Sequence, residues 1–165
     1  MDLVGKVSDI SDLPAVGAYN IRADGCGTAR QNSENIEIIT KTDKPGIDIM
    51  VKPGTKGETV YIPAVITHGG VDDLVYNDFY IGEDADVTYK LRCEDSHHNG
   101  IHRFFLAKNS KVLYLEKHYG EGDGSGKRII NPETEVFAEE GSTMEMNTVQ
   151  IKGVDSTKRV SKAEL

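Results

Sequence analysis

DADVTY (residues 84–89) is the stretch that decides the fold. A turn-forming aspartate is followed by a segment with apolar side chains at alternate positions, Val87 and Tyr89. Side chains of a β-strand alternate between its two faces, so these two residues share one face. The same six-residue pattern recurs along the chain without gaps. The other copies are SENIEI (33–38), GETVYI (57–62), NSKVLY (109–114) and GSTMEM (141–146).

The copies are regularly spaced. Their first apolar positions, Ile36, Val60, Val87, Val112 and Met144, step by 24, 27, 25 and 32 residues. Further apolar segments lie between the copies: GIDIMV (46–51), DFYIG (78–82), HRFFLA (102–107) and TEVFA (134–138). A fixed period of roughly 20–50 residues is typical of a solenoid, in which each coil stacks on the previous one. The sequence therefore predicts an all-β protein, a parallel β-helix with coils of about 25 residues.

The composition agrees with a strand-rich fold. Ile and Val together number 28, against 8 Leu, and there are 11 Thr and 7 Tyr. Branched and aromatic side chains fit a pleated, half-buried surface, whereas helix bundles depend on Leu. The alternative is a sandwich or jelly roll whose strands share this spacing by coincidence. Sandwich strands usually recur every roughly 8–12 residues with tight turns between them.

Charge and cysteine content restrict the function classes. The net charge of −8 argues against binding to nucleic acid or to anionic lipid. No apolar run approaches the roughly 20 residues of a membrane span. The first residues, MDLVGKVSDISDLPAVGAY, do not form a secretory signal, and two cysteines are too few for a disulfide framework. We therefore expect a cytoplasmic protein with reduced thiols.

The last repeat is followed by TVQIKGVDSTKRVSKAEL, which reads as further strand and turn. A coil buries its inward face only against neighbouring coils, and an unpaired sheet edge invites pairing with another chain. Because no polar capping element follows the repeat, the sequence predicts a homo-oligomer formed through the open edge of the β-helix.

CEDSHHNGIH (93–102) concentrates a thiol and three imidazoles in ten residues. Glu116 and His118 lie two positions apart on a later strand, and therefore on one face. Stacking of adjacent coils about 4.8 Å apart would bring these groups together. The sequence predicts a site for iron, zinc or a cluster, because thiolate, imidazole and carboxylate ligate these metals. Its ligands would be Cys93, His98, His102, Glu116 and His118.

Two questions about this site stay open at the level of sequence. The segment could instead be a solvated polar turn with stacked histidines. A four-iron cluster usually takes four cysteine ligands, so a single thiolate cannot hold one alone. A dimer could supply two thiolates, or a histidine–carboxylate site could hold iron or zinc.

Several long blocks resemble the SufB/SufD family, and more narrowly its short archaeal and bacterial members. The blocks are GAYNIRADG (17–25), KPGIDIMVKPGTKGETVYIP (44–63), LVYNDFYIGEDADVT (74–88), NGIHRFF (99–105), EKHYGEGDGSGKRIINPET (116–134) and MEMNTVQIKGVDSTKR (144–159). The resemblance implies a right-handed parallel β-helix that serves as a scaffold, not an enzyme, in the SUF machinery for iron–sulfur cluster assembly. It also implies a SufC-like ATPase and a second SufB- or SufD-like subunit as partners. Cys93, His98 and His102 would contact the iron or the nascent cluster.

The sequence departs from the family pattern in two places. Family chains are longer and dock on the ATPase through a C-terminal helical segment that has no counterpart here. Relatives also carry a longer stretch before the Asp-Ser-x-His block, where this chain has only Tyr89–Glu94. We expect a lead segment at 1–18 and a β-helix core at 19–165, open at its C-terminal end.

Two other functions fit parts of the sequence. The first is a cupin-type metal-dependent β-sandwich enzyme with His98, His102, Glu116 and His118 as ligands, although the chain lacks a His-x-His pair on one strand. The second is a carbohydrate-active β-helix, which would need an aromatic groove and paired acids. The chain has no Trp and no obvious acid pair.

Overall fold

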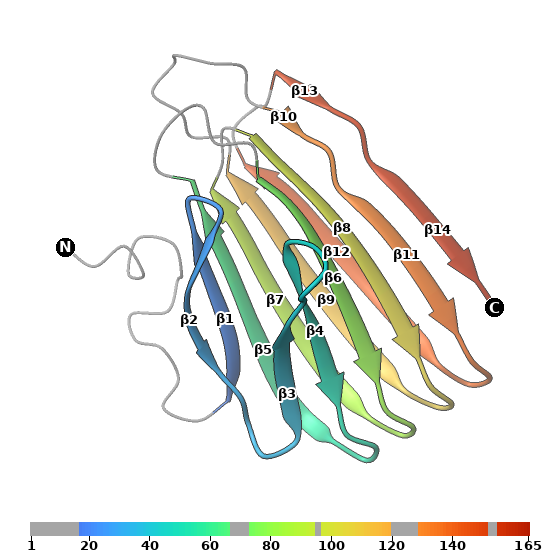
Figure 1. Ribbon diagram of the computed structural model, residues 1–165. Coiled ribbons are helices and arrows are strands. Elements are labelled where there is room, and N and C mark those ends of the chain that lie inside the picture. Colours follow the sequence, from blue (N-terminus) through green and yellow to red (C-terminus); the bar gives the residue numbers. More distant parts are fainter. Residues whose placement is uncertain (1–16, 67–72, 95–96, 120–128, 152–154) are drawn as a thin grey trace.

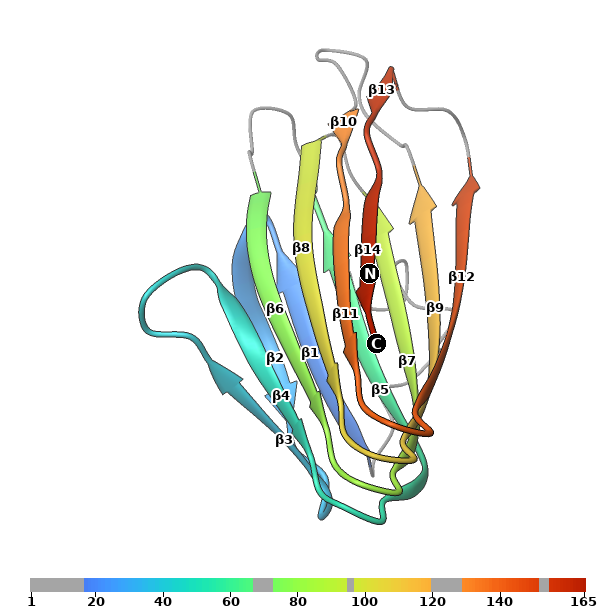
Figure 2. The ribbon, with the colours of Figure 1, turned by 90° about the vertical axis from the view of Figure 1, so that its right-hand side faces the viewer.

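The computed structural model describes residues 17–66, 73–94, 97–119, 129–151 and 155–165, which form strands and turns (Figure 1). The strands make two sheets that face each other as two layers (Figure 2). Among the described residues, no helix has the length and apolar character needed to cross a bilayer.

Each sheet collects strands that are far apart in the sequence. In spatial order the first sheet contains β12 (Thr143–Ile151), β9 (Lys111–Tyr119), β7 (Asp86–Glu94), β5 (Lys56–Val65), β1 (Ala18–Ala23) and β2 (Cys26–Gln31). The second contains β13 (Ser156–Thr157), β10 (Ile129–Ile130), β8 (His97–Leu106), β6 (Asp73–Ile81), β4 (Gly46–Val51) and β3 (Ile36–Thr40). In the second sheet, β11 (Glu133–Ala138) also pairs with β8, and β14 (Val160–Glu164) pairs with β11.

The pairing between coils is parallel, which confirms the predicted parallel β-helix. Strands β5, β7, β9 and β12 pair in parallel in the first sheet, and β4, β6, β8 and β11 do so in the second. From β4 onward the chain passes alternately from one sheet to the other. Each coil therefore lies on the previous one, as the period of about 25 residues predicts.

The first copy of the repeat is not a coil strand, contrary to the prediction. SENIEI contributes to β3, which pairs antiparallel with β4, and β1 and β2 form a second antiparallel hairpin. The gapless alignment is also wrong at GETVYI. Strands β5 and β7 have a bulge between Lys56 and Glu58, and after it Val60 pairs with Tyr89 instead of Val87. The shift is two residues, so Val60 still points inward.

Of the predicted turn formers, Asp84, Asn109 and Gly141 make turns between the sheets, whereas Gly57 lies within β5. Asp84, Asn109 and Gly141 have φ angles of 58°, 57° and 73°. Asp, Asn and Gly tolerate this left-handed region better than other residues do. Each turn bonds to the next, since the Asp84 N–H donates to the Lys108 carbonyl and the Asn109 N–H donates to the Glu140 carbonyl.

The core lies between the sheets and is centred on four rings. Phe79 and Phe104, from the second sheet, stack with their centroids 4.2 Å apart. Tyr89 and Tyr114, from the first sheet, meet them edge to face at 4.9 and 5.2 Å. All four side chains have no exposed surface. These contacts join the two sheets, because each edge-to-face pair takes one ring from each layer.

Strands β12 and β14 form one side of the molecule (Figure 2). Among the described residues, β12 pairs with β9 and β14 pairs with β11, and neither has a strand on its other side. The inward residues Met144 and Met146 of β12 are only partly buried. Self-association through this edge remains a prediction.

The predicted lead segment lies largely outside the described residues, and the predicted short loop is part of a strand. Of the expected lead segment 1–18, residues 1–16 lie outside the described residues, and β1 begins at Ala18. The short stretch Tyr89–Glu94 is not a loop, because it belongs to β7. The resemblance placed a shortened loop there, but the alternation of inward residues continues through Leu91 and Cys93.

Candidate functional site

Two neighbouring strands carry polar side chains into the interior at the same level. In β9 the inward residues are Val112, Tyr114, Glu116 and His118, and their exposed fractions are 3%, 0%, 3% and 1%. The inward-facing side chains of β9 therefore change from apolar to polar toward the end of the strand. A carboxylate and an imidazole inside a protein need partners, because burial of an unpaired charge is costly.

The parallel register places Cys93 of β7 beside His118 of β9, and Leu91 beside Glu116. Cys93 is buried, with 3% of its surface exposed, and its sulfur is within hydrogen-bonding reach of the His118 ring. Thiol, imidazole and carboxylate thus lie together on the inner face of the first sheet. We call Cys93, Glu116 and His118 the inner cluster.

Glu116 is the most connected member of the inner cluster. The Tyr114 hydroxyl donates to Glu116 Oε1 at 3.0 Å. Arg159 and Thr148 donate to Glu116 Oε2 at 3.1 and 3.3 Å. His118 Nε2 also lies 3.2 Å from Oε2. Burial raises the pKa of Glu116, but His118, His102 and Arg159 outweigh it and hold the pKa well below its usual range.

His118 is held by charge and not by a well-aligned hydrogen bond. Its Nε2 lies within 3.2 Å of Glu116, yet neither ring nitrogen makes a hydrogen bond of acceptable angle. Burial lowers the pKa of His118, but Cys93 and Glu116 outweigh this effect and raise the pKa to about 10. The ring is therefore protonated at neutral pH and forms a buried ion pair with Glu116.

The ion pair predicts how stability depends on pH. Because the pKa of His118 rises from 6.5 to about 10 on folding, its contribution is complete below pH 6.5 and is lost as the pH rises toward 10. Because the pKa of Glu116 falls from 4.5 on folding, its contribution is complete above pH 4.5 and is lost at lower pH. We expect urea titrations to show a free energy of unfolding at least about 1 kcal/mol lower at about pH 9 than at about pH 5.5.

The His118→Gln variant provides the control for this prediction. It retains the rest of the inner cluster but has no imidazole to titrate. Its free energy of unfolding should lose most of the decrease between about pH 5.5 and pH 9. An equal decrease in the variant and the unmodified chain would contradict the assignment to His118.

His102 approaches from the opposite sheet. It is buried in β8, with 3% of its surface exposed, and its ring centroid lies 6.3 Å from that of Tyr114. Its neighbours in the second sheet are also polar. Asn77 Nδ2 lies 3.5 Å from His102 Nδ1, and Thr134 is its register partner on the other side. The side chains of Asn77, His102 and Thr134 therefore form a polar row that faces the inner cluster across the interior.

The structure brings together four of the five residues predicted from the sequence. Cys93, Glu116 and His118 form the inner cluster, and His102 lies across from it. The backbone of His98 belongs to β8 and pairs with Ile130, but its side chain lies outside the described residues. Within the described part of the chain, no three His, Cys, Asp or Glu side chains are already arranged to hold a metal ion.

Sequence reasoning missed three partners of Glu116: Tyr114, Thr148 and Arg159. The repeat contained a signal for two of them. Tyr114 lies two positions before Glu116 on the same strand face, and Thr148 lies 32 positions after it, the same step as from Val112 to Met144. Nothing in the repeat points to Arg159, which reaches Glu116 from the segment between β13 and β14.

The inner cluster combines the donor types that bind iron and zinc with a proton held on His118. It lies inside a β-helix, next to an apolar and aromatic core and across from the polar side chains of Asn77, His102 and Thr134. The function must be inferred from this fold and this cluster, since no family model, no curated protein and no solved structure matches the chain.

Proposed function

We propose that the protein is a scaffold of the SufB/SufD type, which holds iron or a nascent iron–sulfur cluster as cargo and has no turnover of its own. The observation that carries the proposal is the inner cluster, a thiol, an imidazole and a carboxylate buried side by side within a β-helix. The fold and the sequence blocks that resemble the family support the same proposal.

The chemistry of the inner cluster suits iron as cargo. Thiolate and imidazole are common iron ligands, and carboxylate oxygen completes a mixed donor set. Buried ionisable groups with strongly shifted pKa values are also concentrated at functional sites. As described, however, Glu116 and His118 are paired with each other. Iron binding would have to displace the proton of His118, so the apparent affinity should increase with pH.

The proposed partners follow from the same resemblance. They are a SufC-like ATPase and a second SufB- or SufD-like subunit, in the cytoplasm. The outer edges of β12 and β14 support pairing with another chain, because unpaired N–H and C=O groups of an edge strand offer a template for a further strand.

The cupin-type alternative receives no support from the fold. A cupin is built of antiparallel strands, whereas the pairs between coils are parallel here. The alternative takes His98, His102, Glu116 and His118 as ligands of one metal, and the side chain of His98 lies outside the described residues. No observation on the described residues favours it over the scaffold.

Anaerobic titration with Fe²⁺, followed by reconstitution with sulfide, tests the proposal. We expect the chain to bind iron and to develop visible absorbance on reconstitution. Cys93→Ser and His118→Ala should each lower the affinity for iron at least about tenfold, the loss that even outer-shell changes cause at metal sites. Cys26→Ser is the matched control, because Cys26 is the exposed thiol and lies in β2, outside the inner cluster.

Two results would contradict the proposal. One is the absence of iron binding by the unmodified chain. The other is an equal loss in Cys93→Ser and Cys26→Ser, which would show that iron binds to any accessible thiol. Circular dichroism of each variant shows whether the β-helix is retained, so that unfolding is not mistaken for loss of a ligand.

A further inference from the structure

Arg159 connects the buried inner cluster to the surface of the molecule. It lies between β13 and β14 on the side of the second sheet, yet its guanidinium reaches Glu116 of the first sheet. The side chain therefore crosses from one layer to the other. The Glu116 side chain is 3% exposed, whereas that of Arg159 is 34% exposed. One partner of this ion pair thus lies inside the β-helix, and the other extends to solvent.

The ion pair lies at the end of the interior that β12 and β14 border (Figure 2). Among the described residues, no further strand lies beyond these two. Thr148 of β12 is the register partner of Glu116, and its side chain is only half-buried. Of the residues that hydrogen-bond to Glu116, Thr148 and Arg159 come from this end. Arg159 therefore stands between the carboxylate and the solvent.

The guanidinium of Arg159 holds the carboxylate with a single hydrogen bond. Its Nη2 donates to Glu116 Oε2 at 3.1 Å, and its Nη1 donates to Thr148 Oγ1 at 3.3 Å. The Thr148 hydroxyl in turn donates to the same Oε2 at 3.3 Å. A planar guanidinium can donate two parallel bonds to one carboxylate, which is the stronger arrangement. Arg159 does not use it and is therefore loosely held.

A second arginine pair in this protein has the stronger arrangement. Arg103 donates from Nε and Nη2 to the two carboxylate oxygens of Asp78, at 2.8 and 2.6 Å. The side chains are 36% and 3% exposed, nearly the same as in the pair of Arg159 and Glu116. The two pairs thus differ in geometry and not in exposure. Partial exposure alone does not explain the loose contact of Arg159.

Arg159 occupies the oxygen that lies nearest to the other cation of the cluster. Glu116 Oε2 accepts from Arg159 and lies 3.2 Å from His118 Nε2, whereas Oε1 accepts from the Tyr114 hydroxyl. A metal ion on Oε2 would be in direct contact with the guanidinium, and two like charges at that distance repel each other. Metal binding at Oε2 therefore requires Arg159 to leave, and its exposed side chain can turn into water.

We propose that Arg159 is a latch. It closes the route from this end of the interior to the inner cluster, and it holds the Glu116 carboxylate until iron displaces it. The identity of iron as the displacing ion rests on the proposed function, whereas the closed route depends on the fold alone.

Alkylation of Cys93 by iodoacetamide tests the closed route without iron. The Cys26→Ser background leaves Cys93 as the one thiol of the chain. We expect Arg159→Gln to raise the alkylation rate at least about tenfold in buffer without denaturant, because the buried thiol reacts only when the structure opens. Arg159→Lys retains the charge and most of the length, and its rate should stay within about threefold of that of the background chain.

Arg103→Gln is the matched control for alkylation. It removes the more tightly bonded pair at the same exposure, so it should destabilise the fold at least as much as Arg159→Gln does. Arg103 lies on the outer face of the second sheet, since its neighbour His102 points inward. If alkylation followed unfolding, this variant would accelerate it as well. We expect its rate to stay within about twofold of that of the background chain.

Titration with Fe²⁺ tests the displacement. Arg159→Gln should bind Fe²⁺ at least about fivefold more tightly than the unmodified chain, because the metal no longer competes with a charged hydrogen-bond donor. This change is opposite in sign to the losses expected for Cys93→Ser and His118→Ala.

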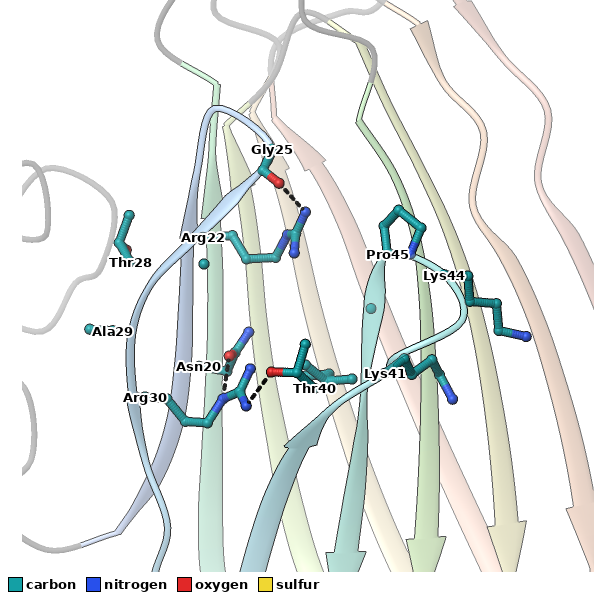
Figure 3. A pocket seen from close by; sticks show the side chains of 13 residues that line it. Asn20, Arg22, Gly25, Thr28, Ala29, Arg30, Thr40, Lys41, Lys44 and Pro45 are labelled. Carbon is teal, nitrogen blue, oxygen red and sulfur yellow. Dashed lines mark hydrogen bonds between the residues drawn. The ribbon is translucent and has the colours of Figure 1, made fainter.

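Arg30→Gln is the control for net charge, since removal of any cation makes the chain more attractive to Fe²⁺. Arg30 lies in β2, at the opposite side of the first sheet from β12, and it donates to Asn20 and Thr40 (Figure 3). Its removal should change the affinity for Fe²⁺ by no more than about twofold at roughly 0.15 M salt, where distant charges are screened.

Two alkylation results would overturn the closed route. One is an equal rate in Arg159→Gln and the background chain, and the other is an equal acceleration by Arg103→Gln. Weaker or unchanged binding of Fe²⁺ by Arg159→Gln would overturn the displacement. Absence of iron binding by the unmodified chain would overturn both the displacement and the proposed function, but alkylation would still decide whether Arg159 closes the route. Failure of the latch and failure of the proposed function are therefore distinguishable.

Discussion

Glu116→Ala is expected to lower the free energy of unfolding by about 3–5 kcal/mol at about pH 6, where the ion pair with His118 is complete. The alanine leaves the His118 charge buried, with 1% of its side chain exposed, and removes the acceptor of the Tyr114 hydroxyl. Arg159 is 34% exposed and can turn toward water, so it adds less to the cost. Urea titration monitored by circular dichroism measures the effect.

Glu145→Ala is the matched control for this prediction. Glu145 lies in β12 on the first sheet, is exposed, and accepts a hydrogen bond from Asn147. Its removal should change the free energy of unfolding by no more than about 0.5 kcal/mol. An equal cost for both variants would mean that the buried ion pair contributes no stability.

A double variant separates the charge from the packing. Glu116→Leu combined with His118→Leu removes both charges and fills the interior with apolar atoms, which often restores the stability lost when a single partner is removed. We expect the double variant to be more stable than Glu116→Ala. If the free-energy costs of Glu116→Leu and His118→Leu measured alone add up to the cost of the double variant, Glu116 and His118 are not coupled.

Phe79→Ala is expected to cost about 3–5 kcal/mol, the range for removing a fully buried phenyl ring. Phe79 stacks on Phe104 within its own sheet and meets Tyr89 of the other sheet edge to face. Its loss would therefore leave a cavity at the contact between the two layers. Urea titration at neutral pH gives the change in the free energy of unfolding.

Phe105→Ala makes the same chemical change on the outer face of the second sheet. Phe105 is half-buried and stacks between Tyr80 and Phe137, with centroids 4.9 and 5.1 Å away. Because it leaves no enclosed cavity, we expect a cost of about 1–2 kcal/mol. A larger cost for Phe105→Ala than for Phe79→Ala would contradict the assignment of the core to the space between the sheets.

Much of the inner cluster could be predicted from the sequence, because the repeat is regular where the cluster lies. The step of 25 residues from Val87 to Val112 is the same step that relates Cys93 to His118. A strand alternates with period two, so Glu116 and His118 had to share a face with Tyr114. The prediction that thiol, carboxylate and imidazole lie together therefore needed only local periodicity and the stacking of coils.

The same reasoning failed where the chain leaves the repeat. SENIEI matches the pattern of a coil strand, yet it pairs antiparallel with β4, because a pattern of inward residues is the same for either strand direction. The pairing of Val60 with Tyr89 instead of Val87 also leaves no trace in the alternation, since a shift by two residues preserves the inward face.

The sequence by itself determined the parallel β-helix, its coil length and the meeting of Cys93 with His118, because these follow from periods read along one chain. Only the tertiary structure decided that Arg159 completes the environment of Glu116 and that SENIEI pairs antiparallel with β4. Such contacts depend on strand direction and on the reach of long side chains across elements. Neither property repeats with a period, so neither can be read from spacing.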